Sequence, residues 1–220
     1  MEATTISTTE KLSASRWMVF TIILVVQFQL QLVTFAPAAV ASPIISDLGL
    51  TRTEFGLIMS ALNITIAICQ AMGSVLVDRA GLKLGLFSGL ALVGIGAALL
   101  LGVHSLTFLV LGRVLQGIGI GIIYPVLGAL IMAWFPKREH PYINTIFAAV
   151  TFLGIGAGML VTDGLFRWFR GSWRHAIGSY GFSILATALV WLVIGRNSQE
   201  VVSAENKSAA GAPARNSFLS

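Results

Sequence analysis

The chain has 220 residues, of which 56% are hydrophobic and only 10% are charged. A soluble domain of this size carries far more charge on its surface, so the composition indicates a helical membrane protein in contact with a lipid bilayer. The net charge of +5 does not indicate nucleic-acid binding, because the basic residues lie between apolar runs rather than on one face.

Six apolar runs follow one another, and each is long enough to cross a bilayer, which takes about 20 apolar residues. A polar cytoplasmic tail at residues 1–16, expected to be disordered, precedes them, and a flexible cytoplasmic tail at 195–220 follows. We therefore expect an all-α membrane protein with one six-helix transmembrane domain at 17–194. The expected helices span residues 17–41, 55–77, 84–103, 106–134, 142–165 and 176–194.

The connection between the first two helices, residues 42–54, is expected to be polar and to end in a helix-start signal. Thr51 is followed three residues later by Glu54, which is the spacing of a capping box. Pro125 lies inside the long fourth helix, where we expect it to bend the helix.

A short charged turn joins the second and third helices at residues 74–83. Asp78, Arg79 and Lys83 are too costly to leave in hydrocarbon, so the turn is expected at the membrane surface. Gly81 supplies the backbone freedom for a tight turn. The two helices that flank the turn must then be antiparallel neighbours.

The order of residues in this turn, small-x-Leu-x-Asp-Arg-x-Gly-x-Lys, resembles the loop after the second helix in the major facilitator superfamily of transporters. Two positions depart from that pattern: Ser74 stands where glycine is usual, and Leu82 where a basic residue is usual. The pair Trp173-Arg174 also resembles one that the superfamily carries before its sixth helix.

This resemblance implies a major-facilitator-type half bundle, built as a 3+3 inverted repeat of helices. Pro37 and Pro125 stand at matching positions of the two repeats, as interrupted helices do in such transporters. The resemblance also implies a gating role for the turn, in which its residues stabilise the outward-facing state. The gating residues are Asp78, Arg79, Gly81 and Lys83.

Arg113 is the charged residue expected deepest in the membrane, about 10 Å below the start of the fourth helix at about 1.5 Å per residue. Its segment, residues 112–117, resembles a fourth-helix element in which the arginine is linked to the transport pathway or to coupling. An unpaired arginine there favours an anionic solute. Alternatively, it snorkels outward, hydrogen-bonds to glutamines on neighbouring helices, or pairs with Asp163, the nearest acid.

Polar side chains share faces of the first, second and fourth helices by their helical spacing. By resemblance to the superfamily, the first and fourth helices line the central cavity. The alternative is that the same residues only hydrogen-bond between helices. The candidate substrate-binding residues are Arg113, Gln27, Gln31, Asn63 and Tyr124; Thr34 and Gln70 share the faces of their helices, and Gly117 shares that of Arg113.

Small-residue pairs in the third, fourth and fifth helices predict close helix packing. The fifth helix lacks the Gly-Pro of the superfamily's antiporters, which disfavours proton-drug antiport. No set of residues indicates an enzyme, a metal site or a cofactor. The glycine pairs are Gly85/Gly89, Gly117/Gly121 and Gly154/Gly158, and the histidines, all expected in loops, are His104, His140 and His175.

Basic residues predict the orientation of the helices, because cytoplasmic loops carry an excess of lysine and arginine. We expect both termini in the cytoplasm and the chain in the bacterial inner membrane. The side with the termini carries Lys11, Arg16, Arg79, Lys83, Lys137, Arg138, Arg196 and Lys207, and the other side carries Arg52, Arg167, Arg170 and Arg174.

The superfamily usually has twelve helices, with the substrate between two six-helix halves, and the resemblance covers one half. The chain is then a fragment, one product of a split gene, or a half that dimerises. We expect it to transport a small solute, organic or inorganic and anionic, by alternating access together with a second six-helix half. The alternative is a non-transporting partner or regulator of a full-length carrier.

Overall fold

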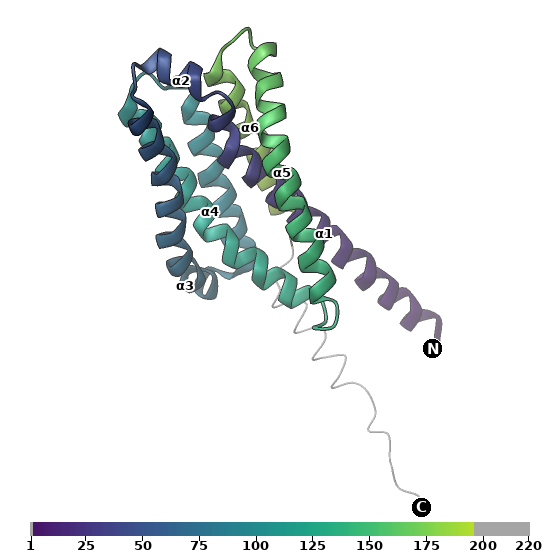
Figure 1. The fold of residues 1–220 in the computed structure, drawn as a ribbon. Helices are drawn as coiled ribbons and strands as arrows, with labels where there is room; N and C mark the ends of the chain where they lie inside the picture. The colour runs from purple at the N-terminus through teal and green to yellow at the C-terminus, as the bar shows by residue number, and fades with distance from the viewer. Residues whose placement is uncertain (1, 196–220) are drawn as a thin grey trace, which may run out of the picture.

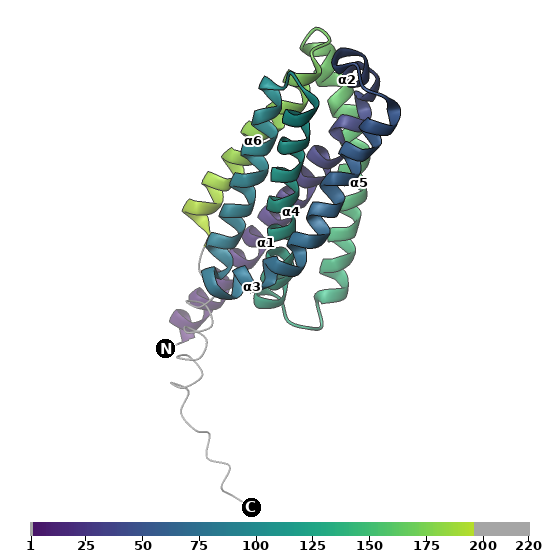
Figure 2. The same ribbon diagram turned by 90° about the vertical axis from the view of Figure 1, so that its left-hand side faces the viewer.

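The computed structural model describes residues 2–195, with side chains from residue 16 onward except at 72, 74 and 76–80. Over this range the chain forms a bundle of long helices, with a short helix across one end (Figures 1 and 2). Six segments are long and apolar enough to cross a membrane, which confirms the predicted six-span helical bundle. The elements are α1 (Glu2–Ala39), α2 (Ala41–Leu48), α3 (Arg52–Leu99), the 3-10 turn η1 (Leu100–Gly102), α4 (Leu106–Trp134), α5 (His140–Trp168) and α6 (Trp173–Ile194).

Helix α3 contains two of the six spans, Arg52–Ala71 and Gly81–Gly102, which we call its first and second arms. The helix is interrupted at Gly81, where φ is 80° and ψ is 163°. Essentially only glycine adopts this conformation without strain. The chain therefore reverses at the predicted turn, and the two arms run antiparallel (Figure 2).

The first arm begins with the predicted capping box. The Thr51 hydroxyl accepts from the Glu54 backbone N–H at 3.2 Å, and the Glu54 carboxylate accepts from the Thr51 N–H at 2.7 Å. These reciprocal bonds satisfy backbone donors that the first turn of a helix otherwise leaves unpaired. The entry into the second span is thus fixed locally by sequence.

Two expectations about the ends of the first span are corrected. Residues 41–48 form the helix α2 rather than a polar connection, because Ile44 is fully buried and Gly49 ends the helix in a left-handed conformation. Helix α1 begins at Glu2, so its backbone is helical where a disordered tail was expected. Extending an existing helix costs less than starting one. The predicted tail from 196 onward lies outside the described residues.

Glycines let α4 approach both arms of α3 closely. A Cβ at Gly117 would lie 2.7 Å from the Thr65 Cβ on the first arm. On the opposite side, a Cβ at Gly119 would lie 2.6 Å from the carbonyl oxygen of Gly89 on the second arm. Helix α4 is therefore held between the two arms by close backbone contact, as the small-residue pairs predicted.

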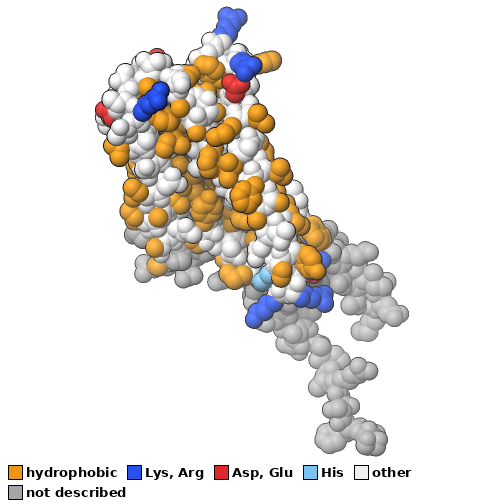
Figure 3. All heavy atoms as spheres, in the orientation of Figure 1, with side chains coloured by type: hydrophobic (Ala, Val, Ile, Leu, Met, Phe, Trp, Pro, Cys, Tyr) orange, Lys and Arg blue, Asp and Glu red, His pale blue; other side chains and the backbone are white. Residues whose placement is uncertain are grey.

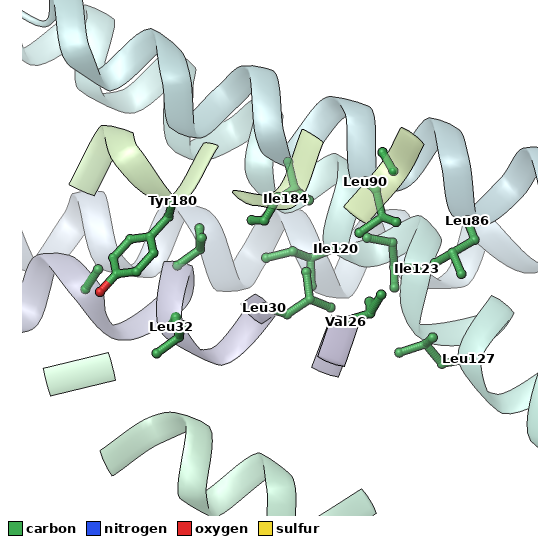
Figure 4. Close-up of a cluster of buried hydrophobic side chains, with 14 of the residues drawn as sticks. Val26, Leu30, Leu32, Leu86, Leu90, Ile120, Ile123, Leu127, Tyr180 and Ile184 are labelled. Carbon is green, nitrogen blue, oxygen red and sulfur yellow. The ribbon is translucent and has the colours of Figure 1, made fainter. Parts of the chain in front are cut away.

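The core lies where α1, α3, α4 and α6 meet, and it is filled by leucine, isoleucine and valine side chains (Figure 4). Helix α5 packs mainly on α1 through a glycine, since a Cβ at Gly154 would lie 2.8 Å from the Gln31 Cβ. The labelled residues of this core are Val26, Leu30, Leu32, Leu86, Leu90, Ile120, Ile123, Leu127, Tyr180 and Ile184.

Two spans leave most of their surface uncovered. In α4, 61% of the apolar span is buried inside the bundle, but the share is only 11% in the first arm of α3 and 17% in α5. Figure 3 shows this face: hydrophobic side chains cover its middle, and charged side chains gather toward its ends. Such a face fits contact with lipid or with another membrane-embedded surface.

Candidate functional site

Arg113 lies inside the bundle with none of its surface exposed. Its Nη1 donates to the backbone oxygen of Val33 at 3.1 Å and to the Gln116 Oε1 at 2.8 Å. Its Nη2 faces the backbone oxygen of Thr34 at 3.4 Å and the Met59 sulfur at 3.7 Å. The guanidinium group therefore joins α1, the first arm of α3 and α4.

Asp163 is not a partner of Arg113. Its carboxylate pairs instead with Arg167, one turn later in α5, at 2.6 Å. Among the described side chains, no carboxylate lies in contact with Arg113, whose bonds go to backbone oxygens, an amide and a thioether. Backbone dipoles satisfy hydrogen bonds but carry no net charge, so the positive charge remains uncompensated by a described acid.

Several buried polar atoms close to this group have no hydrogen-bond partner among the described residues. They are the Nε of Arg113, the Nε2 of Gln116 and, further along α1, the Oε1 of Gln27. An unpaired polar group is costly in an apolar interior. The bundle therefore retains unused hydrogen-bonding capacity next to its buried charge.

The candidate residues of α1 reach α4 and α5. The Gln27 amide donates to the Thr151 hydroxyl of α5 at 2.8 Å, and Gln31 interacts with the Tyr124 hydroxyl of α4. Gln27 and Gln31 are buried, and Tyr124 is partly exposed. The structure thus brings Gln31 of α1 close to Tyr124 of α4. The α1 residues that contact Arg113, Val33 and Thr34, follow Gln31 within one helical turn.

Asn63 lies apart from these residues. It is exposed on the first arm of α3, and its amide donates to the Met59 backbone oxygen at 3.0 Å. Met59 is the residue whose sulfur contacts Arg113, so Asn63 lies one helical turn from a residue that touches the buried charge, but its own side chain is exposed. Gln70 is exposed on the same arm.

The gating residues can be described only in part. The side chains of Asp78 and Arg79 lie outside the described side chains, and Gly81 makes the chain reversal. The backbone oxygen of Lys83 accepts a 3.0 Å hydrogen bond from the buried indole of Trp191. This bond ties the end of α6 to the start of the second arm; a gating role of the turn stays a prediction.

A polar cluster at the other end of the bundle was not predicted. The Asp47 carboxylate of α2 accepts from the Trp173 indole at 3.1 Å and pairs with Arg174 at 2.7 Å, while the Arg174 Nε also donates to the Val103 backbone oxygen. The Trp173 hydrogen bond and Arg174 hold the pKa of Asp47 below its ordinary value. The cluster joins α2, α6 and the chain after η1.

Sequence reasoning also overlooked two partners inside the bundle. Gln116 lies three residues after Arg113, a spacing that places both side chains on one face and could have indicated the contact. The Thr162 hydroxyl of α5 bonds the Tyr180 hydroxyl of α6 at 2.9 Å, a contact between residues of separate helices. Among the described residues, no group of three His, Cys, Asp or Glu side chains could hold a metal ion.

Six helices that are long and apolar enough to cross a bilayer define a multi-pass membrane protein, and among the described side chains its buried arginine has no acidic partner. The sequence profile of the Major Facilitator Superfamily matches residues 19–219, and the chain belongs to this family. This is a family of transporters rather than enzymes, and the resemblance found in the sequence is confirmed.

Two relatives illustrate the similarity. An uncharacterized protein of Campylobacter jejuni, Cj0987c, is 25% identical over 177 residues, covering 80% of this chain and 54% of the relative. The quinolone resistance protein NorA of Staphylococcus aureus is 28% identical over 123 residues, covering 54% of this chain and 32% of NorA. The matched region thus spans at most about half the length of these relatives.

Proposed function

We propose that this chain transports a small anionic solute, organic or inorganic, by alternating access, as one half of a two-half carrier. The solute would be drawn to the region of Arg113 and contacted by polar side chains of α1, the first arm of α3 and α4. Alternating access requires two states of comparable free energy that bind the solute on opposite sides of the membrane. The proposed solute-contacting residues are Arg113, Gln27, Gln31, Asn63 and Tyr124.

The observation that carries the anionic preference is the buried charge of Arg113. A charged side chain deep in a membrane protein is costly and commonly marks a substrate or ion pathway. Its described contacts supply dipoles but no negative charge, so an anion that approached it would be attracted over a longer range than a neutral solute. The unpaired Gln116 Nε2 is a further donor for such an anion.

The second half is proposed from the uncovered face of the bundle. Leu57 on the first arm of α3 and Leu160 on α5 are 65% and 78% exposed, and both belong to the spans with the least burial. Repeats of this kind of transporter are related by an axis along the membrane normal, which allows a second six-helix half to cover this face. That half would be another copy of the chain or a separate chain.

We also propose the orientation that the basic residues predicted. The turn at 74–83 and the residues around Lys137 would face the cytoplasm of a bacterial cell, and so would both termini. In that orientation, Asp78, Arg79, Gly81 and Lys83 would form the cytoplasmic gate, and the cluster around Asp47 would lie at the outer surface.

The proposal is tested by transport in vesicles that contain the purified chain. We expect uptake of a labelled small carboxylate or inorganic anion, and little uptake of neutral or cationic solutes of similar size. A quinolone belongs in the same solute series because of the NorA similarity. A cysteine in place of Leu160, added to the Cys69→Ala chain, reports by cross-linking whether two copies pair.

Arg113→Ala is expected to abolish uptake while the protein still inserts in the membrane, because it removes the buried charge. Arg167→Ala is the matched control: it also removes an arginine, but one that is exposed and paired with Asp163. Normal uptake by Arg113→Ala would contradict the role of this residue. Paired copies that transport none of the solutes would instead favour a non-transporting partner of another carrier.

A further inference from the structure

Pro37 interrupts the hydrogen-bond ladder of α1 within the membrane span. Proline has no backbone N–H, so the carbonyl four residues earlier, that of Val33, loses its donor within the helix. Val33 is fully buried, so no water reaches it from the surface of the bundle. A buried carbonyl without a donor is costly in a membrane protein, and another group must supply the hydrogen bond.

Arg113 supplies that bond. Its Nη1 donates to the Val33 oxygen at 3.1 Å, and its Nη2 lies 3.4 Å from the next carbonyl, that of Thr34. The planar guanidinium fork can address two adjacent oxygens at once, which an ammonium group does less well. The Thr34 hydroxyl does not compete for the Val33 oxygen, because it donates to Leu30 at 2.7 Å.

The contact connects the interruption of α1 to two other helices. The same guanidinium group bonds Gln116 on α4 and faces Met59 on the first arm of α3. Beyond Pro37, only a few residues of α1 remain before α2, which is itself held at Asp47 by α6. The position of Arg113 therefore affects how the part of α1 around and beyond Pro37 lies against α3 and α4.

The proline in the interior of α4 behaves differently. Pro125 in α4 frees the carbonyl of Gly121, and Gly73 of α3 approaches that carbonyl: a Cβ at Gly73 would lie only 2.9 Å from its oxygen. None of the hydrogen bonds of Arg113 goes to Gly121. Pro125 thus provides an internal control for any effect that is specific to Pro37.

We propose that Arg113 replaces the hydrogen-bond donor missing at Pro37 and so holds the interrupted part of α1 against α3 and α4. This role goes beyond the proposed transport and does not depend on it. It is compatible with attraction of an anion, since the carbonyl groups leave the net charge of the guanidinium in place. The pairing predicts that the importance of Arg113 depends on the residue at position 37.

The test is a double-mutant cycle on the purified full chain in detergent, with the melting temperature as the readout. Pro37→Ala restores a backbone N–H that can bond the Val33 oxygen within the helix. We expect the loss of melting temperature caused by Arg113→Met to be at least halved in the Pro37→Ala background. In the Pro125→Ala background the loss should equal that in the native chain. Arg113→Lys should follow the same pattern with smaller losses.

Equal losses in the native and Pro37→Ala backgrounds would overturn the proposal, because an arginine that only fills space or attracts solute is indifferent to position 37. The proposal would also be overturned if Pro125→Ala reduced the loss of melting temperature caused by Arg113→Met as much as Pro37→Ala does. If Arg113→Met alone gives no folded protein, the proposal requires that adding Pro37→Ala restores a monodisperse product, and failure to do so counts against it. None of these readouts involves transport, so they stand apart from the uptake assay.

Discussion

At the scale of single residues, the five glycines of α4 differ in what surrounds them. A side chain at Gly119 would meet backbone atoms of the second arm of α3, at 2.6 Å from the Gly89 oxygen and 2.9 Å from the Val93 nitrogen. A side chain at Gly128 would meet nothing within 4 Å. The first glycine is therefore needed for packing, whereas the second only costs helix stability.

Gly119→Ala is expected to destabilise the protein by about 1–3 kcal/mol, because the added methyl group must push two helix backbones apart. Gly128→Ala is the matched control in the same helix. It should leave stability unchanged or raise it by up to about 1 kcal/mol, the usual difference in helix propensity. Thermal unfolding in detergent checks both, and a Gly119→Ala protein as stable as the native chain would show that α4 and α3 are less closely packed.

At the scale of elements, α2 is held to α6 by a pair of polar contacts at the end of the bundle. Asp47 accepts from Trp173 and pairs with Arg174, and both Asp47 and Arg174 remain partly accessible to solvent. Exposed ion pairs contribute little to the free energy of unfolding, typically below about 1 kcal/mol. This contact therefore orients α2 more than it stabilises the whole bundle.

The contact is expected to depend on pH. The pKa of Asp47 is lowered below 3.8 by its hydrogen bond from Trp173 and by Arg174, so its stabilising effect is present above that pH and is lost as pH falls through the lowered pKa. The native chain should unfold at a higher temperature than Asp47→Asn above pH 3.8, and the difference should shrink below the lowered pKa. A difference that persists unchanged in acid would contradict an ionised Asp47.

At the scale of the whole molecule, the sequence predicts the spans, the turn and the close packing of glycine-containing helices, but not the polar contacts between helices. The spans follow from the length of the apolar runs, and the reversal at Gly81 follows from a glycine within a charged segment. The backbone partners of Arg113 could not be predicted, because they are carbonyl oxygens 79 and 80 residues away, one of them freed by a proline.

The other features that the sequence did not predict also depend on contacts between segments far apart in the chain. Helix α2 is short, and the burial of Ile44 that favours it comes from neighbouring helices rather than from local pattern. Asp47 and Trp173 are 126 residues apart, so only the assembled bundle brings them together. Helical spacing predicts the polar faces of α1 and α4. It does not predict that the Asn63 side chain is exposed, which follows from the small buried share of the first arm of α3.

Labelling of single cysteines from one side of the membrane tests the central claim most directly, that the chain crosses the bilayer six times. Cys69 is first replaced by alanine, which keeps the Cβ that contacts Gly121. In intact cells, a membrane-impermeant maleimide should label Arg52→Cys and Arg167→Cys but not Lys83→Cys or Lys137→Cys. Labelling that places residues 83 and 137 on opposite sides of the membrane would contradict the account.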